Sequence, residues 1–143
     1  MGDESNNCQT LEQLENDYWK APEQFPTGMV KEIYSLRQKP LNEFDSNDIR
    51  LLISQNVGLD YLVPKAIDIL KTDILEEALY FPGDLLMALL QVNDDYWIKN
   101  KKNKNILVSL VSDFNPSQYM EALTEEIIVD LNESLRKFLS NQG

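Results

Sequence analysis

The sequence predicts an all-α protein, a single compact domain of about six or seven packed helices. Apolar residues recur at spacings of three and four, most regularly over residues 120–138, which is typical of the buried face of an amphipathic helix. No alternation of apolar and polar residues runs longer than about four residues, so strands are not predicted. The Asn-Gly and Asp-Gly pairs that mark tight hairpins are also absent from the sequence.

The length and composition of the chain predict one domain. It has 143 residues, of which 43% are hydrophobic, which suffices for one sizeable core. No apolar run reaches the roughly 20 residues that a membrane-spanning helix needs. Because the first residues are polar and acidic, they do not resemble a secretory signal, and we expect a cytoplasmic protein. We expect residues 1–9 to form a flexible leader and residues 10–143 to form the helical domain.

The first two helices are predicted from their start and stop signals. Thr10 and Gln13 have the spacing of a capping box, in which each side chain binds the other residue's backbone N–H. A short helix is therefore expected after Thr10. A second helix is expected over about residues 28–38, where apolar side chains recur at helical spacing. Pro40 ends this helix, because the residue before a proline avoids the helical conformation.

The next two helices are separated by a glycine. Asp45 or Ser46 is expected to cap a third helix, since each has a side-chain oxygen that can accept a backbone hydrogen bond. Gly58 is placed to break the chain after that helix. A fourth helix is expected to begin near residues 62–63, because Pro64 is tolerated only in the first turn.

The remaining helices are predicted from prolines and from apolar periodicity. Pro82 is expected at the first position of a fifth helix, where its missing N–H breaks no helical hydrogen bond. The lysine-rich tract over residues 99–104 is either a loop or the exposed start of a sixth helix. Asn115 and Pro116 are expected to begin the last helix. Its apolar face consists of Met120, Leu123, Ile127, Leu131, Leu135 and Phe138.

The residue types present argue against an enzyme or a metal site. The sequence has no histidine and one cysteine, Cys8, which excludes Ser-His-Asp and Cys-His catalysis and zinc sites that depend on histidine. The acidic pairs Glu76-Glu77, Asp94-Asp95 and Glu125-Glu126 are adjacent in sequence. Neighbouring side chains on a helix point about 100° apart, so they do not converge on one cation. We predict no catalytic residue, no metal and no cofactor.

The charge of the chain narrows the class of partner. Its net charge is −11, from 24 acidic and 13 basic residues. A chain of this charge should be repelled by nucleic acid and by anionic membranes, whereas a basic protein is its natural complement. Solubility alone also explains the acidity. The tract over residues 99–104 has no interleaved aromatic residue to stack on bases, so a solvated segment is predicted there.

Three aromatic pairs lie close to acidic residues in the sequence: Tyr18-Trp19, Tyr80-Phe81 and Tyr96-Trp97. Such pairs can anchor an interface, because they combine a large apolar area with a polar group. They can equally fill gaps between packed helices. We predict that Trp19 and Trp97 fill the core, and the sequence leaves the tyrosines open between the two roles.

Four segments resemble a known family when they are taken in order. They are residues 11–19 (LEQLENDYW), 36–41 (LRQKPL), 48–64 (DIRLLISQNVGLDYLVP) and 80–86 (YFPGDLL). Together they look like the immunity proteins of bacterial contact-dependent growth inhibition (CDI) systems. The resemblance covers residues 10 to 98 and is weak over the remainder of the chain.

The resemblance implies a function and a partner. Such a protein stays in the cytoplasm of the producing cell and binds the C-terminal toxin domain that sister cells deliver by contact. It blocks that toxin, commonly a nuclease, and needs no cofactor. The shared residues are then expected to determine the fold, and toxin recognition to lie elsewhere on the surface. These shared residues are Trp19, Pro64, Pro82, Gly83 and Leu85.

We predict toxin contacts on the segments that flank the fifth helix, with occlusion of the toxin's active site or substrate cleft as the mechanism. These residues are Glu76, Glu77, Asp94, Asp95 and Tyr96. The alternative is a helical adaptor that binds a peptide or partner protein, which would expose an apolar groove. An enzyme would instead require a deep pocket with convergent acids.

Overall fold

The structure confirms the all-α fold class. The computed structural model describes residues 8–140, so nearly all of the predicted leader lies outside the described residues. Over residues 8–140 it has eight α-helices and no named strand. The helices are α2 (Leu11–Glu15), α3 (Gly28–Arg37), α4 (Ser46–Ser54), α5 (Leu59–Thr72), α6 (Asp84–Leu90), α7 (Asp94–Lys99), α8 (Lys101–Val111) and α9 (Glu125–Ser140). Two 3-10 helices accompany them, η1 (Leu41–Glu43) and η2 (Pro116–Tyr119).

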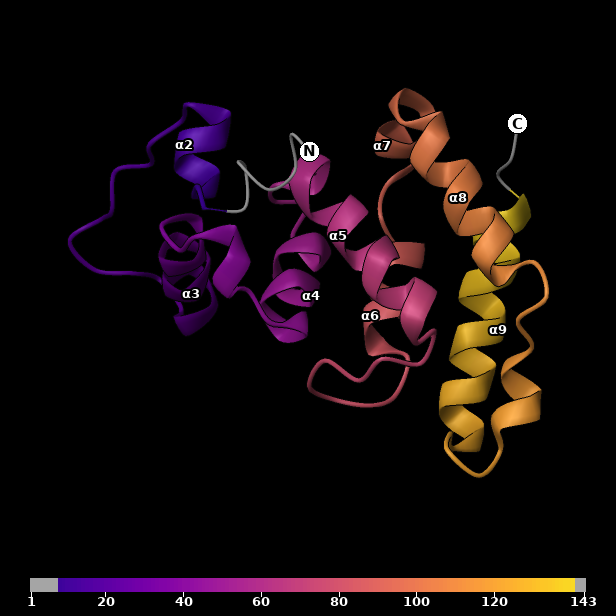
Figure 1. Ribbon diagram of the computed structural model, residues 1–143. Helices are drawn as coiled ribbons and strands as arrows, with labels where there is room; N and C mark the ends of the chain where they lie inside the picture. The colour runs from indigo at the N-terminus through magenta and orange to yellow at the C-terminus, as the bar shows by residue number, and fades with distance from the viewer. Residues whose placement is uncertain (1–7, 141–143) are drawn as a thin grey trace.

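The helices follow one another along the length of the molecule (Figure 1). α2 and α3 lie at one end, α4, α5 and α6 in the middle, and α8 and α9 at the other end. α4 packs against both α5 and α6, while α8 packs on α5 and α9 on α6. Leu52, Leu62, Leu85, Leu86 and Leu89 are fully buried among them. No helix within residues 8–140 is long and apolar enough to span a bilayer.

α9 closes the core at the C-terminal end of the described chain. Its buried residues are Leu131, Leu135 and Phe138, three of the six predicted for its apolar face. The ring of Phe138 meets that of Trp97 edge-on, with 5.5 Å between centroids. Trp97 is only 2% exposed, as predicted for a core residue. The inner face of α9 therefore completes the burial of a tryptophan that belongs to α7.

Two predicted boundaries in the first half of the chain are confirmed and two are wrong. The capping box at Thr10 forms, and Asp45 caps α4. Gly58, however, does not follow α4 directly: Asn56 takes the left-handed turn there (φ 59°), and Gly58 (φ 66°) precedes α5. α5 begins at Leu59 and holds Pro64 in its interior. The hydrogen bond lost at Pro64 is offset because the residues around it are buried in the core.

The predicted starts of the fifth and last helices are also corrected. α6 begins at Asp84, because Gly83 takes a left-handed conformation (φ 90°) and Pro82 forms an isolated bridge with Glu77. Pro116 begins η2 instead of the last helix. α9 starts at Glu125, where Thr124 Oγ1 accepts the N–H of Ile127 at 3.2 Å. The lysine-rich tract forms the end of α7 and the first turn of α8. Of the two predicted alternatives, a loop or the start of a helix, the structure therefore shows the start of a helix.

Asp48 links the end of α3 to the start of α4. Its Oδ2 accepts the N–H of Asp45 at 3.2 Å and Lys39 Nζ at 2.8 Å. The hydrogen bond to Asp48 raises the pKa of Lys39, although partial burial acts in the opposite direction. This carboxylate therefore both completes the α4 capping box and fixes the α3–α4 connection.

Replacing Gly58 by alanine should lower the free energy of unfolding by about 1–3 kcal/mol. A Cβ at this position would lie 2.9 Å from both Cδ atoms of Leu11, which is fully buried, and φ is +66°. Gly28→Ala is the matched control, because a Cβ there has no neighbour within 4 Å and the residue lies in α3. Urea unfolding should show Gly28→Ala unchanged or slightly more stable. Equal stability of the two variants would contradict the tight packing of Leu11 on Gly58.

Candidate functional site

The five predicted contact residues fall into two groups that flank α6. Glu76 and Glu77 lie in the segment between α5 and α6, here called the 73–83 loop. Asp94, Asp95 and Tyr96 lie in the first turn of α7. In Figure 1 the loop runs beneath α4 and α6, whereas α7 is near the top. The structure therefore presents two separate surfaces instead of one patch.

The α7 group combines two exposed acids with one buried tyrosine. Asn93 Oδ1 accepts the N–H of Tyr96 at 2.9 Å and so begins the helix. Asp94 and Asp95 are exposed, whereas Tyr96 is 7% exposed and its hydroxyl accepts a hydrogen bond from Asn103 at 3.0 Å. Burial raises the pKa of Tyr96; the Asn103 hydrogen bond lowers it, and the Asp60 charge raises it further. Tyr96 thus fixes α7 against α8, while the two acids project from it.

A polar depression of about 360 Å³ lies between the start of α5 and α7. Asp95 and Tyr96 line it from α7, with Glu15 from α2 and Asp60 from α5. Lys99 is the basic residue in this lining, so carboxylates outnumber cations. Within residues 8–140 no group of three acidic, cysteine or histidine side chains is placed to hold a metal ion. The arrangement suits the basic side chains of a partner protein.

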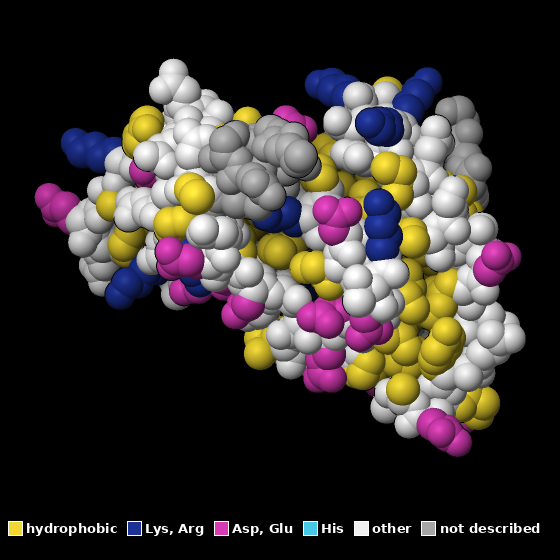
Figure 2. Space-filling model, in the orientation of Figure 1, with side chains coloured by type: hydrophobic (Ala, Val, Ile, Leu, Met, Phe, Trp, Pro, Cys, Tyr) yellow, Lys and Arg dark blue, Asp and Glu magenta, His cyan; other side chains and the backbone are white. Residues whose placement is uncertain are grey.

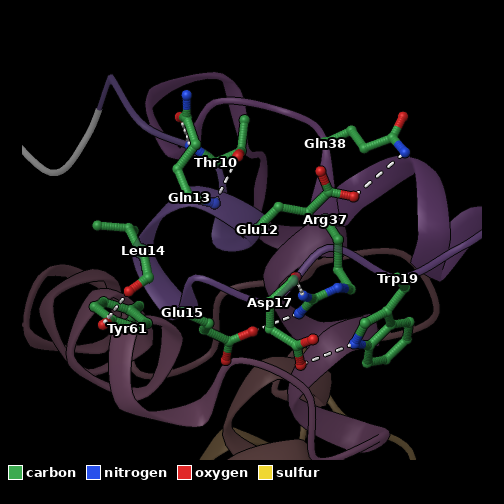
Figure 3. Close-up of polar contacts among 10 residues, drawn as sticks. All are labelled: Thr10, Glu12, Gln13, Leu14, Glu15, Asp17, Trp19, Arg37, Gln38 and Tyr61. Carbon is green, nitrogen blue, oxygen red and sulfur yellow. Dashed lines mark hydrogen bonds and ion pairs between the residues drawn. The ribbon is translucent and has the colours of Figure 1, made fainter.

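A buried arginine lies behind Glu15 (Figure 3). Arg37 is 1% exposed, and its guanidinium donates to the Glu15 carboxylate and to the Asp17 carbonyl. It also lies over the ring of Trp19, 4.2 Å from the centroid, and Trp19 Nε1 donates to Asp17 Oδ2 at 3.2 Å. Trp19 is 37% exposed, so the prediction that it fills the core is wrong. Its ring covers Arg37 instead.

A second buried charge, Asp84, holds the 73–83 loop. Its Oδ1 accepts the N–H of Ala78 at 2.7 Å, and its Oδ2 accepts those of Leu79 at 3.0 Å and Tyr80 at 2.9 Å. No functional or structural role was predicted for Arg37 or Asp84 from the sequence. The available signal was their position within the segments LRQKPL and YFPGDLL that carry the family resemblance.

Both predicted groups lie in a stretch of the chain that is acidic throughout. No lysine or arginine occurs between Lys71 and Lys99, a stretch that contains six acids. In Figure 2 acidic side chains gather at the lower edge of the visible face, and basic side chains gather at the top right. The lysines of the 99–104 tract therefore do not neutralise the 73–83 loop.

Comparison with known proteins gives the family. Residues 13–107 match the family described as CDI immunity proteins. No curated protein and no solved structure matches the chain significantly. The matched region is more than half of the chain and includes α3 to α7, the buried Arg37 and Asp84, and both predicted contact groups. The chain belongs to the family of CDI immunity proteins.

Proposed function

We propose that this protein neutralises the C-terminal toxin domain of its CDI effector by forming a stoichiometric complex in the cytoplasm of the producing cell. The family match carries this proposal. It acts as an inhibitor and not as an enzyme, and it needs no cofactor. The acidic depression beside α7, lined by charged and amide side chains, favours this role over that of an adaptor with an apolar groove.

The mechanism we propose is occlusion of a nuclease active site or substrate cleft. A nuclease holds phosphates with basic groups, and exposed carboxylates compete for those groups. Glu77, Asp94 and Asp95 are exposed and supply such carboxylates. Glu76, which accepts a hydrogen bond from Ser46 Oγ at 2.6 Å, and Tyr96 at the wall of the depression complete the proposed contacts.

The test is co-expression with the toxin domain encoded just upstream of this protein. Wild-type protein should restore growth and co-purify with the toxin domain. Asp94→Lys with Asp95→Lys should slow association about tenfold at low salt, and the difference should shrink as salt screens the charges. Surface-based kinetics at two ionic strengths measures both effects.

Glu125→Lys with Glu126→Lys is the matched control. It makes the same charge change, also on two exposed acids in the first turn of a helix, α9. Association should stay within about twofold of wild type if the α7 acids contact the toxin. Equal slowing of both variants would show that net charge alone matters. Failure of the wild-type protein to protect or to co-purify would overturn the proposed function.

A further inference from the structure

We infer that Leu79 and Tyr80, at the tip of the 73–83 loop, form the apolar anchor by which this protein holds its toxin domain. The inference rests on the proposed function and adds to it a contact that the acidic residues do not supply. The partner surface it requires is an apolar pocket bordered by lysine or arginine side chains.

The first observation is the exposure of two adjacent large side chains. Leu79 is 53% exposed and Tyr80 is 68% exposed. Of the other exposed aromatic residues, Trp19 packs on Arg37 and Tyr34 and Tyr119 packs on Phe114, whereas Tyr18 is also 60% exposed. Leu79 and Tyr80 thus leave most of their apolar area to water, and a partner that covers it gains the free energy of desolvation.

The second observation is that the backbone of the loop is fixed. The buried Asp84 carboxylate, 4% exposed in the residue as a whole, binds the N–H groups of Leu79 and Tyr80 directly. Gly83 N–H bonds to the carbonyls of Leu75 at 3.1 Å and Glu76 at 3.3 Å, which closes the loop at its base. Because charge-assisted hydrogen bonds hold the tip, little conformational entropy remains to be lost on binding.

Side chains of α4 support the same loop. The Arg50 guanidinium lies 4.9 Å from the centroid of the Tyr80 ring. Asn47 Oδ1 accepts from Arg50 Nε at 3.1 Å and from its terminal nitrogen at 2.9 Å, which orients the guanidinium. Ser46 Oγ, one residue earlier, donates to Glu76. Tyr80 is therefore held at one side and exposed over the rest of its surface, as anchoring aromatic residues of interfaces are.

The charged residues of the 73–83 loop indicate which kind of partner surface is complementary to its tip. The loop contains three acids, Asp73, Glu76 and Glu77, and no lysine or arginine. Figure 2 shows acidic and apolar side chains together at the lower edge of the visible face, where Figure 1 has the loop. Apart from Arg50, which lies against one side of the Tyr80 ring, the loop presents apolar and acidic side chains. Such a surface is complementary to an apolar pocket with a basic rim, and this is the surface that the proposal requires of the toxin domain.

The test measures the affinity of the purified toxin domain for variants of the full chain by calorimetry. Leu79→Ser with Tyr80→Ser should weaken binding by about 100-fold, as expected for the loss of an interface anchor. The melting temperature should not change, because neither side chain is buried. Met120→Ser with Val129→Ser removes two side chains outside the loop that are 69% and 61% exposed, and this variant should bind within about threefold of wild type.

Leu79→Met with Tyr80→Phe separates a contact role from disturbance of the loop. It keeps the apolar area and should retain binding within about fivefold. Wild-type affinity of the serine variant would overturn the anchor while leaving the proposed function intact. The anchor would also be overturned by a combination of two results. The serine variant would lose binding and show a lowered melting temperature, and the conservative variant would lose binding as well. If wild-type protein does not bind the toxin domain, the proposed function fails first.

Discussion

Replacing Asp84 by alanine should lower the free energy of unfolding by about 3–4 kcal/mol. The carboxylate accepts three backbone N–H groups at 2.7–3.0 Å, and its removal leaves the loop without these acceptors. Asp84→Asn should be intermediate, since an amide keeps one oxygen but turns an NH₂ group toward one of the same donors. Urea unfolding gives the free energy, and hydrogen exchange at residues 78–80 shows whether the loop itself opens.

Asp68→Ala is the control for Asp84. Asp68 lies on the surface of α5, its side chain is 75% exposed, and its ion pair with Lys71 spans 3.7 Å. Such a pair contributes about 0–1 kcal/mol, so the variant should unfold close to wild type. If Asp84→Ala lowered the free energy of unfolding by less than about 1 kcal/mol, the carboxylate would not be what fixes the loop. The anchor proposed on that loop would then lose its support.

Replacing Arg37 by methionine should lower the free energy of unfolding by about 3 kcal/mol. Methionine fills similar space, but the Glu15 carboxylate and the Asp17 carbonyl both lose their donor. This loss of stability is at the low end of the range for breaking a buried ion pair, because the Glu15 side chain is 30% exposed and water can solvate it. Arg37→Lys should lose less, since it keeps the charge but not the planar contact with Trp19.

Tryptophan fluorescence distinguishes a local from a global effect in these Arg37 variants. Trp19 lies on Arg37 and is partly exposed, whereas Trp97 is buried at the far side of the core. The folded Arg37→Met protein should therefore show a red-shifted Trp19 contribution with Trp97 unchanged. Arg136→Met, at an exposed position of α9, should unfold within about 0.5 kcal/mol of wild type. A similar loss in both variants would contradict a special role for Arg37.

Local signals predicted the helices well where the cap lies next to the helix in sequence. Thr10 and Asp45 were identifiable because their side chains bind N–H groups three residues away. The starts of α5 and α6 were missed for a different reason. Gly58 and Gly83 both take left-handed conformations directly before a helix. α5 therefore begins earlier than expected, at Leu59, and α6 begins later than expected, at Asp84. Pro64 stays inside α5 because core packing outweighs one lost hydrogen bond.

The candidate site was predictable only in its exposed part. Adjacent acids such as Asp94 and Asp95 are recognisable as surface groups from the pattern around them. Arg37 was not recognisable, because its partners lie 20 and 22 residues away in sequence. A charged residue becomes buried when distant segments supply its hydrogen bonds, and no local pattern encodes that. Tyr80 was visible in the sequence as part of an aromatic pair, but its support by Arg50 on α4 was not, because that contact also joins distant segments.

The contact between Phe138 and Trp97 has a consequence for how this protein can diverge. The family pattern ends at residue 107, inside α8, yet the core it describes is completed by α9 beyond it. The boundary of the shared pattern therefore cuts through one folding unit. The two faces of α9 are under opposite constraints: Leu131, Leu135 and Phe138 must keep their shape, whereas Val129 and Asp130 on the outside are free to vary. α9 therefore joins an outer face that tolerates substitution to an inner face that packing constrains.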